Sequence, residues 1–155
     1  MSTEIERKFL LKNDSWKSEA DAGKEYSQGY IVGSDQASVR VRIEGEQAFI
    51  NIKSATIGIT RLEYEYEVPL NEAYEMLDSL CEKPLISKTR YLVKVQSHTW
   101  EIDVFKGDNA GLVVAEIELS DVNESFIKPS WIGEEVSDDA RYYNVCLIKH
   151  PFKDW

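Results

Sequence analysis

Apolar and polar residues alternate with a period of two along most of this chain. Successive side chains of a β-strand point to opposite faces of a sheet, so this pattern predicts strands. We expect eight of them, and Gly45 marks the turn of one hairpin. The predicted strands are Glu4–Leu11, Glu25–Val32, Ser38–Glu44, Gln47–Lys53, Arg61–Val68, Ile86–Val95, Thr99–Phe105 and Leu112–Leu119.

Helical patterns are fewer. The best candidate is Asn71–Leu80, where Asn71 would cap the first turn and Glu72 suits its positive end. Asp14–Gly23 is polar and could hold a helical turn. Many strands with few helices predict a mainly β (α+β) fold, either a sandwich or a closed barrel, in one domain over residues 1–155.

Three features near the C-terminal end predict short helices. Asp121 with Glu124 resembles a capping box. Ser137 is expected to cap a second short helix that ends at Tyr142. The Gly133–Glu135 stretch is interpreted as a turn leading into that helix, rather than as a set of ligands.

The charged residues of the predicted strands form same-sign pairs at a spacing of two. Charges of one sign on one strand face repel each other, and a solvated face would more naturally mix both signs. An ordinary surface remains the default interpretation for any single strand. The pairs are Glu4/Glu6, Arg40/Arg42, Glu63/Glu65, Lys88/Arg90 and Glu116/Glu118.

If the strands close into a barrel with these faces inward, the interior holds two sets of charges. Buried charge is unfavourable unless it is paired or ligated. A polyanion bridged to a divalent metal satisfies both sets, since Lys and Arg bind phosphate oxygens and carboxylates bind Mg²⁺ or Mn²⁺. The acidic set is Glu4, Glu6, Glu63, Glu65, Asp103, Glu116 and Glu118, and the basic set is Lys8, Arg40, Arg42, Lys53, Lys88 and Arg90.

Composition narrows the class of partner. The 155 residues carry a net charge of −10, which argues against general nucleic-acid binding. The polar start shows no signal peptide and no apolar run is long enough to span a bilayer, so we expect a cytoplasmic protein without a membrane partner. Cys81 and Cys146 are expected to be reduced thiols. The chain could be a monomer or a homodimer.

These motifs together resemble the CYTH superfamily, also called triphosphate tunnel metalloenzymes, and the small bacterial members in particular. The resemblance extends over nearly the whole chain and depends on the order of the motifs, since Glu-x-Glu-x-Lys alone is a weak pattern. The matching stretches are Glu4-Ile5-Glu6-Arg7-Lys8, Gln28-Gly29-Tyr30, Val39-Arg40-Val41-Arg42, Ile52-Lys53, Arg61-Leu62-Glu63-Tyr64-Glu65, Lys88-Thr89-Arg90-Tyr91, Glu101-Ile102-Asp103-Val104-Phe105, Glu116-Ile117-Glu118, Gly133-Glu134-Glu135-Val136 and Arg141-Tyr142.

The resemblance implies an eight-stranded antiparallel barrel that forms a tunnel, with the acidic set binding metal and the basic set gripping a triphosphate. It implies divalent-metal-dependent hydrolysis of inorganic tripolyphosphate to pyrophosphate and phosphate. A Lys–Tyr catalytic dyad, proposed for close relatives, would here be Lys8 with Tyr30. Adenylate cyclase, thiamine triphosphatase and a non-catalytic binder of polyphosphate or nucleotide are the alternatives.

Overall fold

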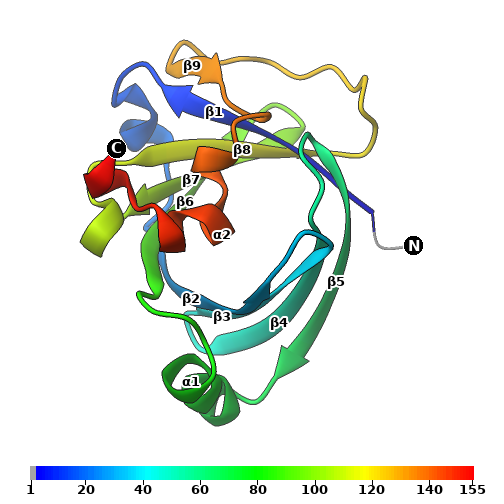
Figure 1. Ribbon diagram of the computed structural model, residues 1–155. Coiled ribbons are helices and arrows are strands. Elements are labelled where there is room, and N and C mark those ends of the chain that lie inside the picture. Colours follow the sequence, from blue (N-terminus) through cyan, green and yellow to red (C-terminus); the bar gives the residue numbers. More distant parts are fainter. Residues whose placement is uncertain (1–2) are drawn as a thin grey trace.

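The computed structural model describes residues 3–155, in which nine strands and two α-helices form a closed β-barrel with flanking segments (Figure 1). All eight predicted strands are present, and each bound lies within one residue of the prediction. The mainly β fold with an eight-stranded antiparallel barrel is therefore confirmed. The strands are β1 (Thr3–Leu11), β2 (Lys24–Gly33), β3 (Ala37–Glu44), β4 (Gln47–Ser54), β5 (Thr60–Val68), β6 (Ile86–Val95), β7 (His98–Phe105), β8 (Val113–Leu119) and β9 (Ile132–Glu135).

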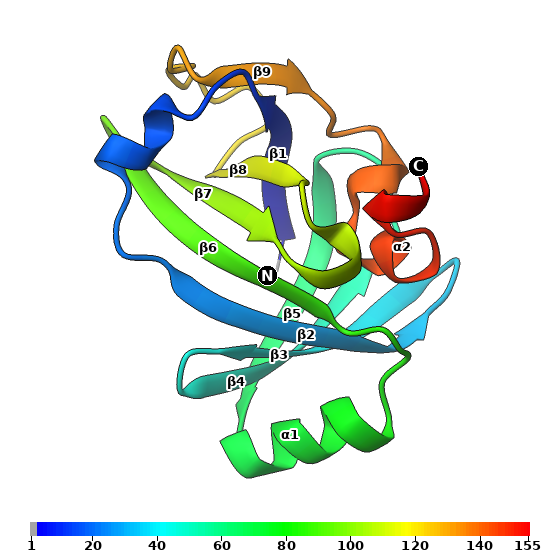
Figure 2. The same ribbon diagram turned by 90° about the vertical axis from the view of Figure 1, so that its left-hand side faces the viewer.

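The barrel closes through β1. Its order is β1-β5-β4-β3-β2-β6-β7-β8 and back to β1, and every pairing is antiparallel. The closing contact is short, because only Thr3–Ile5 lie opposite Thr60–Leu62. Further along, β1 pairs on the same side with β9 instead, and Figure 2 shows β9 beside the C-terminal half of β1.

Helix α1 (Leu70–Ser79) covers the outer face of β3 and β4 (Figure 2). Its Leu77 packs in one buried cluster with Val41 and Ile43 of β3. These two residues alternate with inward-facing charges, so the apolar side of the strand faces the helix and the charged side faces the interior. Asn71 lies within the first turn and makes no side-chain capping bond, so its predicted role as the cap is wrong.

A tryptophan-rich cluster covers the outer face of the other half of the barrel. Trp16 comes from a 3₁₀ turn at Ser15–Glu19, which is the helical turn expected in that region. Trp100 of β7 and Trp131 are also buried there, and their ring centroids lie 5.8 Å apart in an edge-to-face arrangement. Both sides of this half of the wall are therefore occupied, apolar residues outside and charged residues inside.

The helix predicted at Asp121 is absent from the described chain, and residues 120–123 form a turn. The Glu124 carboxylate accepts hydrogen bonds from the backbone N–H (2.7 Å) and hydroxyl (2.5 Å) of Ser120. It also lies 2.5 Å from Nε2 of His98. These bonds from Ser120 and His98 lower the pKa of Glu124 to about 2. The residues of the capping-box pattern therefore stabilise a turn and do not begin a helix.

The stretch interpreted as a turn into a helix is strand β9, so that interpretation is wrong. Gly133 explains how the strand fits against β1. A Cβ atom at this position would lie 3.0 Å from the backbone oxygen of Leu10, so a side chain would push the two strands apart.

Ser137 does not cap a helix, which corrects the second prediction for this region. Its hydroxyl accepts from the backbone N–H of Lys8 (2.9 Å) and donates to Glu135 (2.6 Å). The short 3₁₀ turn at Ala140–Tyr142 is capped by Asp139 instead. Helix α2 (Asn144–Lys149) follows directly and was not predicted.

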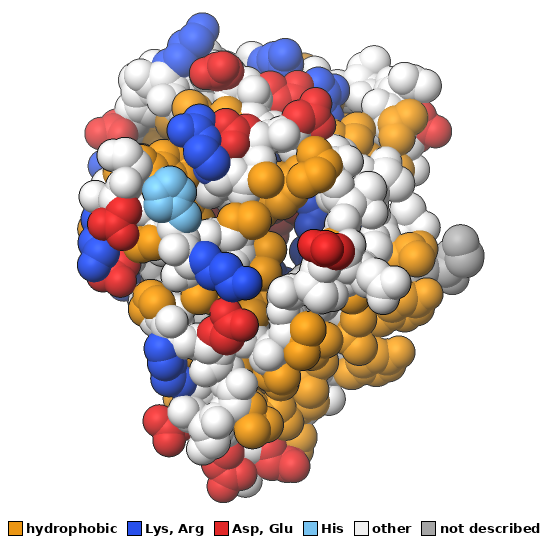
Figure 3. All heavy atoms as spheres, in the orientation of Figure 1, with side chains coloured by type: hydrophobic (Ala, Val, Ile, Leu, Met, Phe, Trp, Pro, Cys, Tyr) orange, Lys and Arg blue, Asp and Glu red, His pale blue; other side chains and the backbone are white. Residues whose placement is uncertain are grey.

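The outer face of β5 has no covering helix or loop among residues 3–155. Leu62, Tyr64 and Tyr66 are 45%, 43% and 58% exposed, and Figure 3 shows hydrophobic side chains gathered over this side of the molecule. None of the helices in the described chain is long and apolar enough to cross a membrane.

Candidate active site in the barrel interior

The strand register places the predicted site residues on one surface, the inner wall of the barrel. Residues directly opposite each other in antiparallel strands share a face. Lys8 lies opposite Glu116, which lies opposite Glu101, and Arg40 lies opposite both Tyr30 and Asn51. Followed around the barrel, this register brings together Glu4, Glu6, Lys8, Tyr30, Arg40, Arg42, Lys53, Glu63, Glu65, Lys88, Arg90, Asp103, Glu116 and Glu118.

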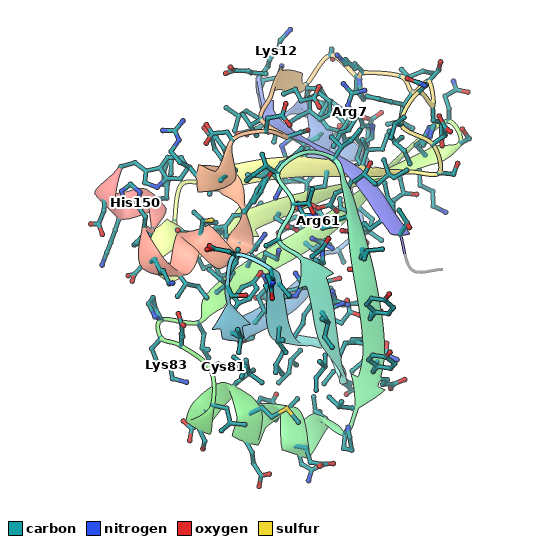
Figure 4. All side chains as sticks on the ribbon, turned by 45° about the vertical axis from the view of Figure 1, so that its right-hand side comes forward. Arg7, Lys12, Arg61, Cys81, Lys83 and His150 are labelled. Atoms are coloured by element: carbon teal, nitrogen blue, oxygen red, sulfur yellow. The ribbon has the colours of Figure 1, made fainter. Side chains whose placement is uncertain are left out.

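Two labelled arginines show the contrast between the inner and outer faces. Arg61 of β5 points toward the barrel interior, whereas Arg7 of β1 lies on the outside near β9 (Figure 4). Arg7 pairs with Glu135 there, at 2.5 Å between Nη2 and Oε1. Figure 3 shows a hollow near the centre of one face of the molecule with Lys and Arg side chains inside it.

Carboxylates gather where β1, β5 and β8 meet. Lys53 lies between two of them, with Nζ 3.1 Å from Glu4 and 3.3 Å from Glu63. Burial raises the pKa of Glu6 to about 8, and the neighbouring Glu116 adds to that increase. Burial, followed by the charges of Glu4 and Glu63, also raises the pKa of Glu118. This acidic group therefore holds more carboxyl groups than its nearby lysines can keep ionised.

A second group on β6 and β7 is internally balanced. Asp103 is 1% exposed and lies 2.7 Å from Nζ of Lys88 and 2.7 Å from Nε of Arg90. Burial opposes ionisation of Asp103, but the two cations outweigh it and lower the pKa of the carboxyl. Burial lowers the pKa of Lys88 to about 8, against the opposing effect of Asp103. Arg90 also contacts Glu101 at 2.9 Å.

A third group on β3, β4 and β5 contains arginines and a buried amide. Arg42 lies 3.1 Å from Glu65, and Asn51 donates to the same carboxylate at 2.6 Å. Arg40 differs from Arg42. It is 8% exposed, yet among residues 3–155 it has no ion pair, and its Nε has no hydrogen-bond partner. Arg40 also lies near enough to Lys53 to oppose that ammonium's charge.

Lys8 and Tyr30 line one small cavity of about 40 Å³ together with Glu6 and Lys53. The Lys8 ammonium lies 3.5 Å from Glu116 and donates to the backbone oxygen of Tyr142 at 3.3 Å. No hydrogen bond between Lys8 and Tyr30 is present in the described chain. The two side chains therefore share a cavity without contacting each other through a hydrogen bond.

The carboxylates fit a hard divalent cation in chemistry, although within residues 3–155 no three potential ligands already converge in a metal-binding arrangement. Mg²⁺ and Mn²⁺ prefer carboxylate oxygens. Glu6 is the clearest indication, because its raised pKa shows that Lys53 and Lys8 do not fully offset the effects of burial and Glu116 on the ionised carboxylate. A bound cation would relieve that repulsion.

Sequence reasoning missed several residues of the interior. Four of them share the inward alternation phase of a predicted neighbour, so the pattern contained a signal for them: Gln28, Asn51, Arg61 and Glu101. The fifth, Asn144, belongs to α2, and its side chain contacts Lys88 at 3.1 Å. No strand pattern indicates that residue.

The structure thus defines a class of protein, a closed antiparallel β-barrel with buried cationic and acidic side chains on its inner wall. Comparison with known proteins identifies the family. Residues 2–145 match the CYTH domain, so the chain belongs to the CYTH family. This confirms the family resemblance of the sequence motifs.

Two curated relatives span nearly the full chain. An inorganic triphosphatase of Acetivibrio thermocellus is 50% identical over 155 residues, covering 100% of this chain and 99% of the relative. An inorganic triphosphatase of Nitrosomonas europaea is 36% identical over 149 residues, covering 94% and 96%. The crystal structure of an inorganic triphosphatase, 34% identical, superimposes with a TM-score of 0.65 over 96% of this chain and 95% of that one.

Proposed function

We propose that this chain hydrolyses inorganic tripolyphosphate to pyrophosphate and phosphate inside the barrel. Arg40 is the observation that carries the proposal, because a buried arginine that forms no ion pair within residues 3–155 is available to bind an anion. The names of the two curated relatives support the same substrate. The net charge of −10 and the inward position of the cations favour a small anion over a nucleic acid.

The cations would hold the phosphate chain. Arg40 and Arg61 form no salt bridge within residues 3–155, and Arg40 lies near enough to Lys53 for the two charges to repel. Lys8, Arg42, Lys88 and Arg90 complete the proposed grip. Phosphoryl transfer needs charge neutralisation and in-line positioning more than covalent help, and fixed cations in a buried site supply both.

The carboxylates would hold Mg²⁺ or Mn²⁺. The ligand set proposed from the sequence is Glu4, Glu6, Glu63, Glu65, Asp103, Glu116 and Glu118. Asp103 and Glu65 each have two polar side-chain partners, Lys88 with Arg90 and Arg42 with Asn51, so we assign them the orientation of those side chains. We assign direct ligation to the other five, of which Glu4, Glu63 and Glu116 contact a lysine that a metal would displace. A bound metal would withdraw charge from the phosphate oxygens.

The attacking water needs a group that accepts its proton. We propose Tyr30 with Lys8 for this role, since both line the small cavity that also contains Glu6. The protein would act in the cytoplasm without a membrane or nucleic-acid partner.

A substrate panel tests this proposal. Tripolyphosphate, thiamine triphosphate, ATP and long polyphosphate are each offered with Mg²⁺ or Mn²⁺, and free phosphate and cyclic AMP are measured. We expect phosphate chiefly from tripolyphosphate. Cyclic AMP from ATP would identify a cyclase instead, and tight binding without turnover would identify a binding protein.

A further inference from the structure

Asn144, in the first turn of α2, reaches two buried residues of the barrel wall. Its side-chain oxygen lies 3.1 Å from Nζ of Lys88 and 2.9 Å from Nε2 of Gln28. Lys88 is 1% exposed and Gln28 is fully buried. The C-terminal segment thus contributes a side chain to a barrel interior whose charged residues come from strands.

Asn144 does not have the role that asparagine usually has at the start of a helix. Asparagine near the start of a helix commonly caps it, but α2 has no side-chain capping bond. The neighbouring Tyr143 anchors the segment instead. Its hydroxyl donates to the backbone oxygen of Ser137 (2.7 Å) and accepts from the N–H of Gly58 (3.1 Å). The Asn144 side chain is therefore needed neither to cap α2 nor to anchor the C-terminal segment.

The ammonium group of Lys88 determines how the side-chain amides of Asn144 and Gln28 are oriented. A lysine ammonium has three donors and no acceptor, so Asn144 must turn its oxygen toward Lys88. Because that oxygen also meets Gln28, the glutamine must present its amide nitrogen to it. The oxygen of Gln28 is then left as a buried acceptor with no hydrogen-bond partner anywhere in residues 3–155.

The two bonds of Lys88 also fix its third donor. One N–H points to Asp103 at 2.7 Å and another to Asn144 at 3.1 Å. In a tetrahedral ammonium, two occupied directions determine the third. Without the Asn144 oxygen, Lys88 would keep its partner Asp103 but could rotate about that single bond.

We propose that Asn144 is a positioning residue of the active site, which aims the free N–H of Lys88 at a phosphate oxygen and holds the Gln28 amide. The Gln28 oxygen then accepts from a donor that arrives with the substrate, either water or a protonated phosphate oxygen. This inference rests on the proposed function, because it assigns Lys88 to the grip on a triphosphate.

Steady-state kinetics on tripolyphosphate with Mg²⁺ tests the role, using Asn144→Leu as the main variant. Hydrogen bonds to charged groups contribute enough that we expect kcat/KM to fall roughly 10- to 100-fold, with KM raised. Asn144→Asp keeps acceptor oxygens for both donors and should recover activity relative to the leucine variant. Tyr143→Phe is the control for a loosened segment, and should lower the unfolding midpoint without changing KM.

A double variant with Gln28→Leu separates positioning from general destabilisation. If both residues act through one bonded unit, the double variant loses no more than the worse single variant within about twofold. Wild-type kinetics in Asn144→Leu, or a loss of kcat that follows the loss of folded protein at unchanged KM, would overturn the inference alone. A wild-type protein inactive on tripolyphosphate would refute the proposed function, and this inference with it.

Discussion

Replacing Glu6 by glutamine should stabilise the metal-free protein at alkaline pH while abolishing its activity. Burial and Glu116 raise the pKa of Glu6 from 4.5 to about 8. Between these values the folded protein keeps a proton that the unfolded chain has released. The free energy of unfolding therefore falls as pH rises, and the loss ends only above the folded pKa.

The size of this effect follows from the linkage relation. One titrating group changes the unfolding free energy by about 1.4 kcal/mol per pH unit, or about 4 kcal/mol between pH 5 and pH 8. Glu6→Gln mimics the protonated form at every pH and lacks this loss. The variant should match the wild type near pH 5 and exceed it by about 4 kcal/mol at pH 8, an upper bound because Glu116 shares the titration.

Urea denaturation in EDTA at pH 5, 6, 7 and 8 measures this difference, since chelation keeps metal from binding the deprotonated carboxylates. Other titrating groups are common to both proteins and cancel when the two are compared. Glu72→Gln, an exposed glutamate on α1, is the matched control and should show no pH-dependent gain. A gain from Glu6→Gln that is the same at pH 5 and pH 8 would refute the raised pKa of this carboxyl.

Three further predictions concern the site and the fold. Arg40→Ala and Glu4→Ala should each abolish phosphate release while circular dichroism stays unchanged; normal activity in either would remove that residue from the site. Chelation by EDTA should stop turnover and added Mg²⁺ or Mn²⁺ should restore it, whereas full activity in EDTA would exclude the proposed metal role. Leu77→Ala should lower the unfolding free energy by about 2–5 kcal/mol, because it opens a cavity between α1 and β3; a loss under about 0.5 kcal/mol, typical of surface sites, would contradict that packing.

The strands of this protein could be predicted because their signal is local. A period of two appears in each strand by itself, and β9 was missed because its four residues are too few to show it. The same-sign pairs supplied information that alternation alone does not contain. They indicated which face of each strand turns inward, and the register around the barrel places them on one inner wall.

The balance of charges inside the barrel could not be predicted, because it depends on distances between side chains of different strands. The sequence grouped Asp103 with Glu6, yet Lys88 and Arg90 lower the pKa of Asp103 whereas burial and Glu116 raise the pKa of Glu6. Asn144 illustrates the same limit. Its contact with Lys88 joins residues that are 56 positions apart in the sequence. Asn144 lies in a helix, and the alternation that predicts strands gives no signal for it.

Phosphorus NMR of tripolyphosphate incubated with the protein and Mg²⁺ tests the central claim most directly. The account predicts that the tripolyphosphate signals are replaced by one pyrophosphate and one orthophosphate per molecule consumed, and that Arg40→Ala leaves the substrate intact. Unchanged tripolyphosphate with the wild-type protein, or equal turnover by Arg40→Ala, would contradict the assignment of the barrel interior as a triphosphate-hydrolysing site.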